Sequence, residues 1–320
     1  MLVVITGGTG FIGRELVVRH VKLGDTVRVL SRSARDGTDF PDAVQLCLGD
    51  VNGDREALAE FCAGADILYH CAGETRDESR MQAANVDGTR NLARAAAGSV
   101  KRWVQLSSVG VYGRRRDGVI TESAELNPVD PYERSKEESE GMAREAATAG
   151  GFELSTLRPS IVFGPGMPNR SFRQMVSMVN RGLFFFVGKP GATVNFTNVY
   201  CVVEALIACG RTPETQGKTY NLSGSCTVED FVGRIAENLG RSAPRLRLPE
   251  APARAAARAA KMAWPGCPLT ESRIDALTNR AVYSSEAIVR DLSFSAAMEK
   301  HNSVDLLVED WRRTRAGPGN

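Results

Sequence analysis

Apolar residues in the first half of the chain follow two alternating patterns. Short β-branched runs, such as residues 2–6, give way to segments in which apolar side chains return every three or four positions, as at Ile12, Leu16 and Val17. The first pattern predicts buried strands and the second predicts amphipathic helices. We expect further strands at residues 26–31, 45–48, 66–71, 103–107 and 154–158, and further helices at residues 55–62, 85–97 and 133–149. Repeated strand–helix–strand units at this spacing predict an α/β fold with a doubly wound parallel sheet.

A glycine-rich turn joins the first predicted strand to the first predicted helix. It reads Thr6-Gly7-Gly8-Thr9-Gly10-Phe11-Ile12-Gly13. The first glycine of such a turn permits a sharp bend, the second lets the backbone approach a pyrophosphate, and the third lets helix and strand pack closely. Amides at the helix N-terminus then attract phosphate. The turn therefore predicts a Rossmann dinucleotide site that includes Gly7, Thr9, Gly10, Phe11, Ile12 and Gly13.

The repeating pattern ends after Gly164-Pro165-Gly166, where the predicted elements become short and irregular. We expect a Rossmann dinucleotide-binding domain in residues 1–165. A smaller, discontinuous, mixed α/β substrate lobe is expected in residues 166–313. Two later segments, residues 199–209 and 218–222, are expected to return to the main sheet.

The end of the second predicted strand bears on the choice of coenzyme. In NAD-binding Rossmann domains a carboxylate at this point bonds the ribose 2′-hydroxyl, but here the strand ends in Ser31-Arg32-Ser33. Arg32 suits a 2′-phosphate, and the alternative is a solvated surface arginine. We therefore expect NADP(H), with NAD(H) as the second choice. The ends of the next two strands add Asp50 and Val51 at the adenine, and Cys71, Ala72 and Gly73 near the nicotinamide ribose and the phosphates.

The second chemical signal is Tyr132-Glu133-Arg134-Ser135-Lys136. Tyr132 and Lys136 are four residues apart, so they share one helix face. A nearby ammonium favours the phenolate and brings the tyrosine pKa closer to a working range. Ser108, at the end of the fifth predicted strand, is placed to bond a substrate carbonyl or hydroxyl. This set predicts proton transfer by Tyr132 coupled to hydride transfer, with Lys136 also bonding the nicotinamide ribose; the alternative is an exposed helix face.

Composition and charge limit the classes of molecule that the chain is expected to bind. The chain has 320 residues, 42% of them hydrophobic and 24% charged, with a net charge of +2. This balance gives no reason to expect nucleic acid or an anionic membrane as the main partner. Seven cysteines without CxxC spacing and only three histidines disfavour disulfides, a metal site and a histidine-based triad. We expect a cytoplasmic protein, without membrane insertion, that acts on a small molecule. The basic, alanine-rich segment 251–263 is interpreted as a solvated helix face, and a membrane-surface helix is the alternative.

The motifs together resemble those of the extended short-chain dehydrogenase/reductase family, the NAD(P)-dependent epimerase/dehydratase group. The matching strings are TGGTGFIG (6–13), GDV (49–51), NVDGTRNL (85–92), SSVGVYG (107–113), PYERSK (131–136), LRPSIVFGPG (157–166) and YNLSG (220–224). The resemblance implies Ser108, Tyr132 and Lys136 as the catalytic triad, and coenzyme contacts from Ser107, Tyr132, Lys136 and Pro159. It also implies a homodimer formed through the helices at 85–97 and 133–149.

Departures from the family pattern bear on the reaction. Dehydratases of this family carry an Asp-Glu pair where this chain has Val109-Gly110, and many epimerases carry an asparagine at the position of Ile161. These differences argue against dehydration and weaken the case for a standard 4-epimerase. We expect reduction or epimerisation of a nucleotide-linked keto sugar, with Arg173 and Arg181 as candidate ligands of the diphosphate. One or more of the three phenylalanines at 184–186 would line the pocket or pack in the core.

Two other functions are carried as alternatives. One is an NADP(H) reductase of an apolar carbonyl, similar to 3β-hydroxysteroid dehydrogenases and dihydroflavonol reductases, which share the LRP-x-x-x-(Y/F)-GPG string and lack the asparagine. The other is a non-catalytic protein that senses a dinucleotide. Such proteins often lose the tyrosine or the lysine, whereas this chain keeps both Tyr132 and Lys136.

Overall fold

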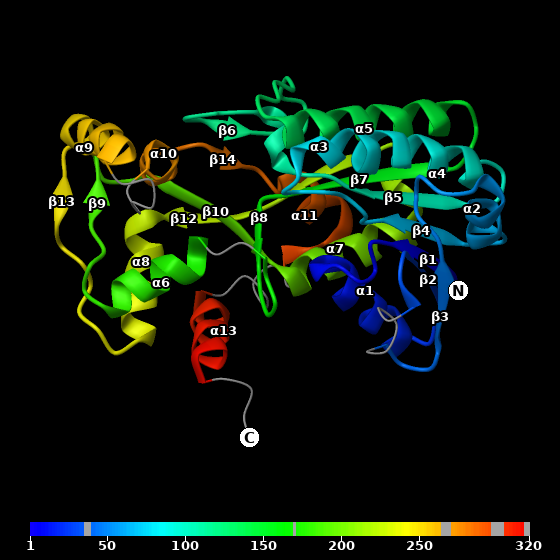
Figure 1. The fold of residues 1–320 in the computed structure, drawn as a ribbon, viewed down its shortest axis with the longest axis horizontal. Coiled ribbons are helices and arrows are strands. Elements are labelled where there is room, and N and C mark those ends of the chain that lie inside the picture. The colour runs from blue at the N-terminus through cyan, green and yellow to red at the C-terminus, as the bar shows by residue number, and fades with distance from the viewer. Residues whose placement is uncertain (35–39, 169–170, 264–269, 296–303, 317–320) are drawn as a thin grey trace.

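The computed structural model describes residues 1–34, 40–168, 171–263, 270–295 and 304–316 (Figure 1). Its larger part is a seven-stranded sheet, in the order β11-β7-β5-β4-β1-β2-β3, in which every neighbouring pair is parallel. The strands are β1 (Leu2–Thr6), β2 (Thr26–Ser31), β3 (Val44–Leu48), β4 (Ile67–His70), β5 (Arg102–Leu106), β7 (Glu153–Pro159) and β11 (Thr219–Leu222). The expected α/β fold with a doubly wound parallel sheet is confirmed.

Helices cover both faces of this sheet. One face carries α1 (Phe11–Lys22), α7 (Val199–Arg211) and α11 (Glu286–Leu292), and the other carries α2 (Arg55–Cys62), α4 (Gly88–Ala96) and α5 (Pro131–Thr148). Successive residues of a strand point to opposite faces. Val3 and Ile5 therefore pack against the first helix layer, while Val4 packs against the second. Helices cover both faces of the sheet, so only the ends of the strands remain free to form sites.

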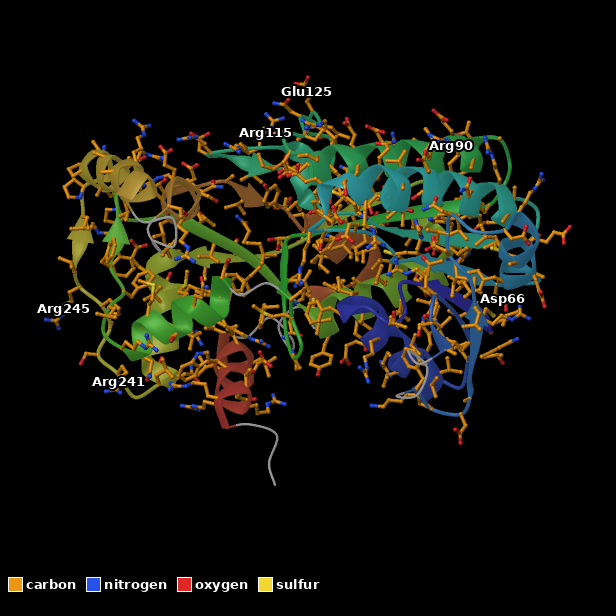
Figure 2. All side chains as sticks on the ribbon, in the orientation of Figure 1. Asp66, Arg90, Arg115, Glu125, Arg241 and Arg245 are labelled. Carbon is orange, nitrogen blue, oxygen red and sulfur yellow. The ribbon has the colours of Figure 1, made fainter. Side chains whose placement is uncertain are left out.

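The smaller lobe is built around a three-stranded sheet, β12-β10-β8, and a two-stranded pair, β13-β9. Its elements are β8 (Ile161–Phe163), α6 (Ser171–Asn180), β9 (Phe186–Val187), β10 (Thr193–Asn198), β12 (Gly224–Thr227), α8 (Val228–Asn238), β13 (Arg247–Leu248), α9 (Glu250–Ala263), α10 (Glu271–Thr278) and α13 (Val304–Ala316). Phe163, Phe172 and Phe231 are fully buried in its core. The end of the lobe far from the main sheet carries Arg241 and Arg245 (Figure 2).

Short elements complete the fold. They are α3 (Glu78–Met81), the π-helical turn η2 (Gln82–Asp87), the 3-10 turns η3 (Val109–Tyr112) and η4 (Pro213–Thr215), and the strand pair β6 (Val119–Ile120) and β14 (Val282–Tyr283). The helix expected at 85–97 therefore begins as a π turn before it becomes regular in α4. Single π turns of this kind occur often at functional sites.

The structure corrects one expectation about the second half. Residues 218–222 supply β11 at the edge of the main sheet, but residues 199–209 do not form a strand. They lie in α7, which packs on the sheet and is buried along most of its length. An apolar run of this kind fits a buried helix as well as a buried strand, so periodicity alone did not separate the two.

The segment 251–263 forms α9, which packs against α10 and pairs its arginines with that helix. Arg254 bonds Asp275 at 2.8 Å, and Arg258 bonds Glu271 at 2.8 Å. The side chain of Lys261 lies outside the described residues. Within the described ranges, no helix is both long and apolar enough to cross a bilayer.

A buried ion pair joins the sheet to α5. Arg158, in β7, donates to both carboxylate oxygens of Glu140 at 2.9 and 2.5 Å, and both side chains are almost fully buried. Arg158 also donates to the Tyr112 hydroxyl at 2.7 Å, and that hydroxyl donates to Asn221 at 2.9 Å. One cation therefore connects α5, β7, η3 and β11. Removing one member leaves an unpaired charge in a dry interior.

We expect Arg158→Met to lower the free energy of unfolding by about 3–5 kcal/mol, because Glu140 would remain buried with only the distant Arg144, at 3.8 Å, as a partner. Replacing both residues, as in Arg158→Met with Glu140→Leu, should recover much of the loss. Lys101→Met, which breaks an exposed pair with Asp66, is the control and should cost at most about 1 kcal/mol. Urea unfolding measures all three; equal losses for Arg158→Met and Lys101→Met would contradict the assigned role.

Candidate active site

The glycine turn brings β1, α1 and the end of β4 into close contact. Gly7 has a φ of +68°, and a Cβ there would lie 2.6 Å from the backbone nitrogen of Ala72. A Cβ on Gly13 would lie 2.1 Å from the carbonyl oxygen of Gly7. Gly10 begins α1 without a side-chain cap, so the first amides of the helix are left for another acceptor. These constraints fit a bound pyrophosphate, which needs a close, uncapped backbone.

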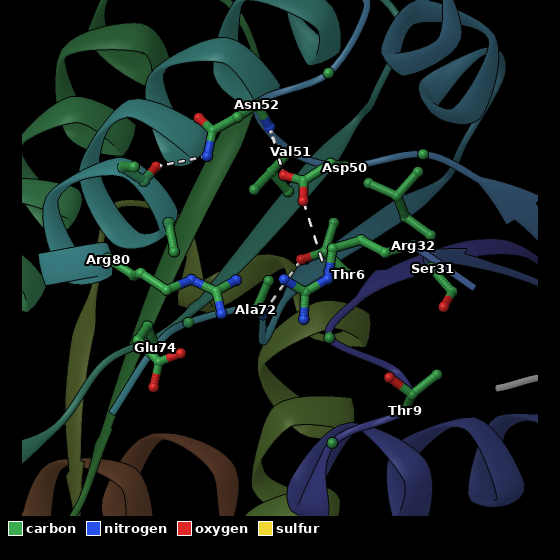
Figure 3. Close-up of a pocket in the computed structure, with 18 of the residues that line it drawn as sticks. Thr6, Thr9, Ser31, Arg32, Asp50, Val51, Asn52, Ala72, Glu74 and Arg80 are labelled. Atoms are coloured by element: carbon green, nitrogen blue, oxygen red, sulfur yellow. Dashed lines mark hydrogen bonds and ion pairs between the residues drawn. The ribbon is translucent and has the colours of Figure 1, made fainter. Parts of the chain in front are cut away.

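A cavity of about 510 Å³, here called the glycine-loop cavity, opens beside this turn at the carboxyl ends of β1, β2 and β4 (Figure 3). Nine of the predicted coenzyme residues line it: Gly7, Thr9, Gly10, Arg32, Asp50, Val51, Cys71, Ala72 and Gly73. Phe11, Ile12 and Gly13 lie in the first turn of α1, outside the lining. Ser107 and Pro159 lie at the ends of β5 and β7 and also stay outside it.

The wall beside Arg32 is formed by a chain of polar contacts. The Arg32 guanidinium lies 3.9 Å from the Asp50 carboxylate, and both side chains are exposed. Asp50 accepts from the amide of Asn52 at 2.9 Å, and the Asn52 side chain donates to the carbonyl of Ala83 at 2.9 Å. These contacts bring the end of β2 and the loop after β3 against the π turn. Asn52 and Ala83 also line the cavity, and the sequence did not predict them as site residues.

Other missed wall residues come from the segment after β4, namely Glu74, Ser79, Arg80 and Ala84. The segment is polar and has no periodicity, so it carries no helix or strand signal. Its position alone could have indicated a role, because loops at the carboxyl ends of parallel strands border the ligand crevice of this fold.

The predicted catalytic residues lie together where β5 and α5 meet. A capping box fixes the start of α5: the amide of Glu133 donates to Asp130 at 2.9 Å, and the Glu133 carboxylate accepts from the amide of Asp130 at 3.2 Å. Tyr132 lies in this first turn and is hydrogen-bonded to the Ser108 side chain. Lys136 lies one turn further on, where its ammonium donates to the carbonyl of Leu106 at 2.7 Å.

Burial dominates the electrostatics of this pair. Removal from water, with a smaller contribution from Asp130 and against the bond to Ser108, raises the pKa of Tyr132 to about 12. Lys136 is not among the groups that shift this pKa, so the expected lowering by its ammonium is not seen. Burial also lowers the pKa of Lys136 to about 8, against the opposing charge of Glu140. Tyr132 is thus a phenol at neutral pH, which suits proton donation.

A second cavity, of about 580 Å³, opens on the other side of Ser108 and runs into the smaller lobe. We call it the Ser108 cavity. Most of its wall is apolar, formed by Val109, Ile161, Phe172, Met175, Met178, Phe184, Phe185, Val194, Ala276, Leu277 and Tyr283. Its polar residues are Ser108, Glu133, Ser160, Ser171, Gln174, Thr193, Asn195, Ser272, Arg273 and Asn279. One end therefore carries the Ser108 hydroxyl, and the body is suited to an apolar molecule; Tyr132 and Lys136 are not among the residues that line either cavity.

The two arginines expected to bind a diphosphate lie outside this cavity. Arg173 faces α13, where it bonds Asp310 at 2.9 Å, and Arg181 is exposed just beyond α6. Arg273 of α10 lines the cavity instead and is hydrogen-bonded to Gln174. Of the three phenylalanines, Phe184 and Phe185 line the cavity, while Phe186 is buried in the lobe core.

Comparison with known proteins identifies the class. Residues 3–223 match the NAD dependent epimerase/dehydratase family, so the chain belongs to this family, within the extended short-chain dehydrogenases/reductases. It is 30% identical over 263 residues to "Sterol demethylase protein B" of Methylococcus capsulatus, covering 78% of each chain. It is 26% identical over 320 residues to the "4-hydroxy-2-methyl-3-oxo-4-farnesyl-3,4-dihydroquinoline-1-oxide ketoreductase" of Stigmatella aurantiaca, covering 95% of this chain and 94% of the relative.

The fold is shared with solved structures at lower identity. The UDP-glucuronic acid 4-epimerase of Bacillus cereus, solved in complex with NAD, superposes with a TM-score of 0.72. The match covers 97% of this chain and 100% of the epimerase, at 18% sequence identity. At that identity the likeness supports the Rossmann-type architecture alone.

Proposed function

We propose that this protein is an NADP(H)-dependent oxidoreductase that interconverts a ketone and a secondary alcohol on a largely apolar small molecule. The observation that carries the proposal is the apolar wall of the Ser108 cavity, together with the location of Arg173 and Arg181 outside it. The sterol demethylase and farnesyl-quinoline ketoreductase relatives bear names of apolar substrates, which supports the same choice. The proposed function is the alternative given above from the sequence, an NADP(H) reductase of an apolar carbonyl.

In the proposed mechanism the chain's own residues bind the substrate oxygen and move its proton. Ser108 and Tyr132 are hydrogen-bonded to each other, so both hydroxyls are placed to bind one oxygen. In reduction Tyr132 donates its proton to that oxygen, and in oxidation its phenolate accepts one. Lys136, one helical turn away, would bond the nicotinamide ribose. A bound nicotinamide would supply or accept the hydride.

A nucleotide-sugar reductase or epimerase is the second candidate. The observation that favours it is Arg273 on the cavity wall, bonded to Gln174, because a guanidinium at that place suits a diphosphate. The fold likeness to the UDP-glucuronic acid 4-epimerase is compatible with it. We also propose, from the sequence, that the protein forms a homodimer through α4 and α5. A cytoplasmic location is a further prediction from the sequence.

The substrate class is tested by the turnover of NADPH with two panels, hydrophobic cyclic ketones and UDP-linked 4-keto sugars. We expect turnover with the first panel only. Met175→Lys should raise KM for the best ketone about tenfold or more, because it places a charge in the apolar wall. Leu246→Lys, at an exposed position outside the cavity and outside α4 and α5, is the matched control and should leave KM unchanged. Turnover of the sugar panel alone would favour the second candidate.

The acid/base assignment predicts that oxidation depends on pH and that reduction does not. Because only the phenolate accepts a proton, kcat/KM for alcohol oxidation should rise about tenfold per pH unit below the tyrosine pKa. Ketone reduction uses the phenol, which predominates, and should be flat across neutral pH. Tyr132→Phe should abolish both directions while the Kd for NADPH changes less than about twofold. Oxidation that does not vary with pH would rule out Tyr132 as the base.

The coenzyme preference is tested by the Kd for NADPH and for NADH, measured by fluorescence titration. We expect tighter binding of NADPH, and a loss of about ten- to a hundredfold for NADPH alone in Arg32→Ser, since a charge-assisted bond to the 2′-phosphate is removed. Arg94→Ser, an exposed arginine of α4 outside the cavity, is the control. Equal or tighter binding of NADH by the unmodified protein would exclude the preference.

A further inference from the structure

The glycine-loop cavity contains a second arginine that the sequence did not indicate. Arg80, on α3, lines the cavity together with Arg32. Figure 3 shows the two side chains entering from opposite walls, with their guanidinium groups directed toward one another. Asp50 lies beside Arg32, and Thr6 of β1 lies next to the Arg32 guanidinium in this view. Two like charges thus share the space between the end of β2 and the segment after β4.

The protein's own carboxylates make only weak contacts with this pair. Arg32 meets Asp50 only at 3.9 Å, and the same carboxylate is already bonded to the amide of Asn52. Across the described residues, the Arg80 guanidinium makes no hydrogen bond or ion pair. Its nearest acid is Glu74, whose carboxylate already accepts from the amides of three following residues. The charged lining residues, Arg32 and Arg80 against Asp50 and Glu74, balance in formal charge, but the two guanidinium groups still have N–H donors to offer an anionic ligand in the cavity.

We propose that Arg80 and Arg32 form a two-sided clamp that binds a phosphate of the coenzyme. A guanidinium presents paired N–H donors that match phosphate oxygens, and two guanidinium groups facing one another are favourable only with an anion between them. Both side chains are exposed and lack strong partners, so closing on a phosphate breaks no buried contact. The inference rests on the proposed coenzyme and extends it to a residue outside the glycine turn.

Two groups of the coenzyme carry this chemistry, the 2′-phosphate and the pyrophosphate. Adenosine 2′,5′-bisphosphate contains the first without the second, and ADP contains the second without the first. Binding of both compounds, and of NADPH and NADH, is measured by calorimetry on the full chain. Arg80→Ala is compared with Arg76→Ala, an exposed arginine of the same segment that bonds the carbonyl of Pro168 and does not line the cavity.

We expect Arg80→Ala to weaken NADPH binding about tenfold or more, and Arg76→Ala to leave it unchanged. A loss confined to adenosine 2′,5′-bisphosphate and NADPH assigns the clamp to the 2′-phosphate. A loss shared by ADP, NADH and NADPH assigns it to the pyrophosphate. Either result supports the clamp, and Arg80→Lys should restore part of the affinity.

Unchanged binding of all four compounds in Arg80→Ala would overturn the inference. An equal loss in Arg76→Ala would also overturn it, because the effect would then belong to the segment and not to the guanidinium. These outcomes are separate from failure of the proposed function. An unmodified protein that binds neither NADPH nor NADH would refute the oxidoreductase itself, whereas an unmodified protein that prefers NADH would still permit the pyrophosphate clamp.

Discussion

The position of the candidate catalytic residues depends on the buried pair between Arg158 and Glu140. Glu140 follows Lys136 by one helical turn, and Lys136 follows Tyr132 by one turn, so a single face of α5 carries all three side chains. Arg158 fixes that face to β7 with two hydrogen bonds. Arg158 also donates to the hydroxyl of Tyr112 in η3. Ser108 is the N-cap residue of η3. One buried cation thus sets the distance between the helix that carries the tyrosine and the strand end that carries the serine.

The same pair affects charge as well as position. A lysine in a dry site loses its proton easily, and burial lowers the pKa of Lys136 to about 8. The carboxylate of Glu140 opposes this shift, because a negative charge one turn away stabilises the ammonium. Arg158 in turn holds the Glu140 carboxylate in place by pairing with it. A structural ion pair in the core therefore positions the carboxylate that helps Lys136 to keep its proton.

The parts of the fold and site that the sequence predicted are those set by local geometry. Gly7 and Gly13 are required by a bend and a close approach within one strand–turn–helix unit, and Tyr132 and Lys136 are related by one helical turn. Long-range contacts were beyond such reasoning. Arg173 looked free in the sequence, but its partner Asp310 lies 137 residues away. For the same reason most of the wall of the Ser108 cavity, drawn from α6, β10 and α10, was not predicted, and only Ser108 and the phenylalanines at 184–186 were named as candidates.

The two cavities differ in the kind of interaction that they offer, and this difference explains why one was predicted better than the other. The glycine-loop cavity is lined by backbone, small residues and arginines, so its ligand is recognised by shape at the turn and by charge at the wall. Motifs encode both features. The Ser108 cavity is lined mainly by apolar side chains, and burial of apolar surface is non-directional. Many combinations of apolar residues can produce such a wall, so substrate preference can change without any change in the motifs that define the coenzyme site.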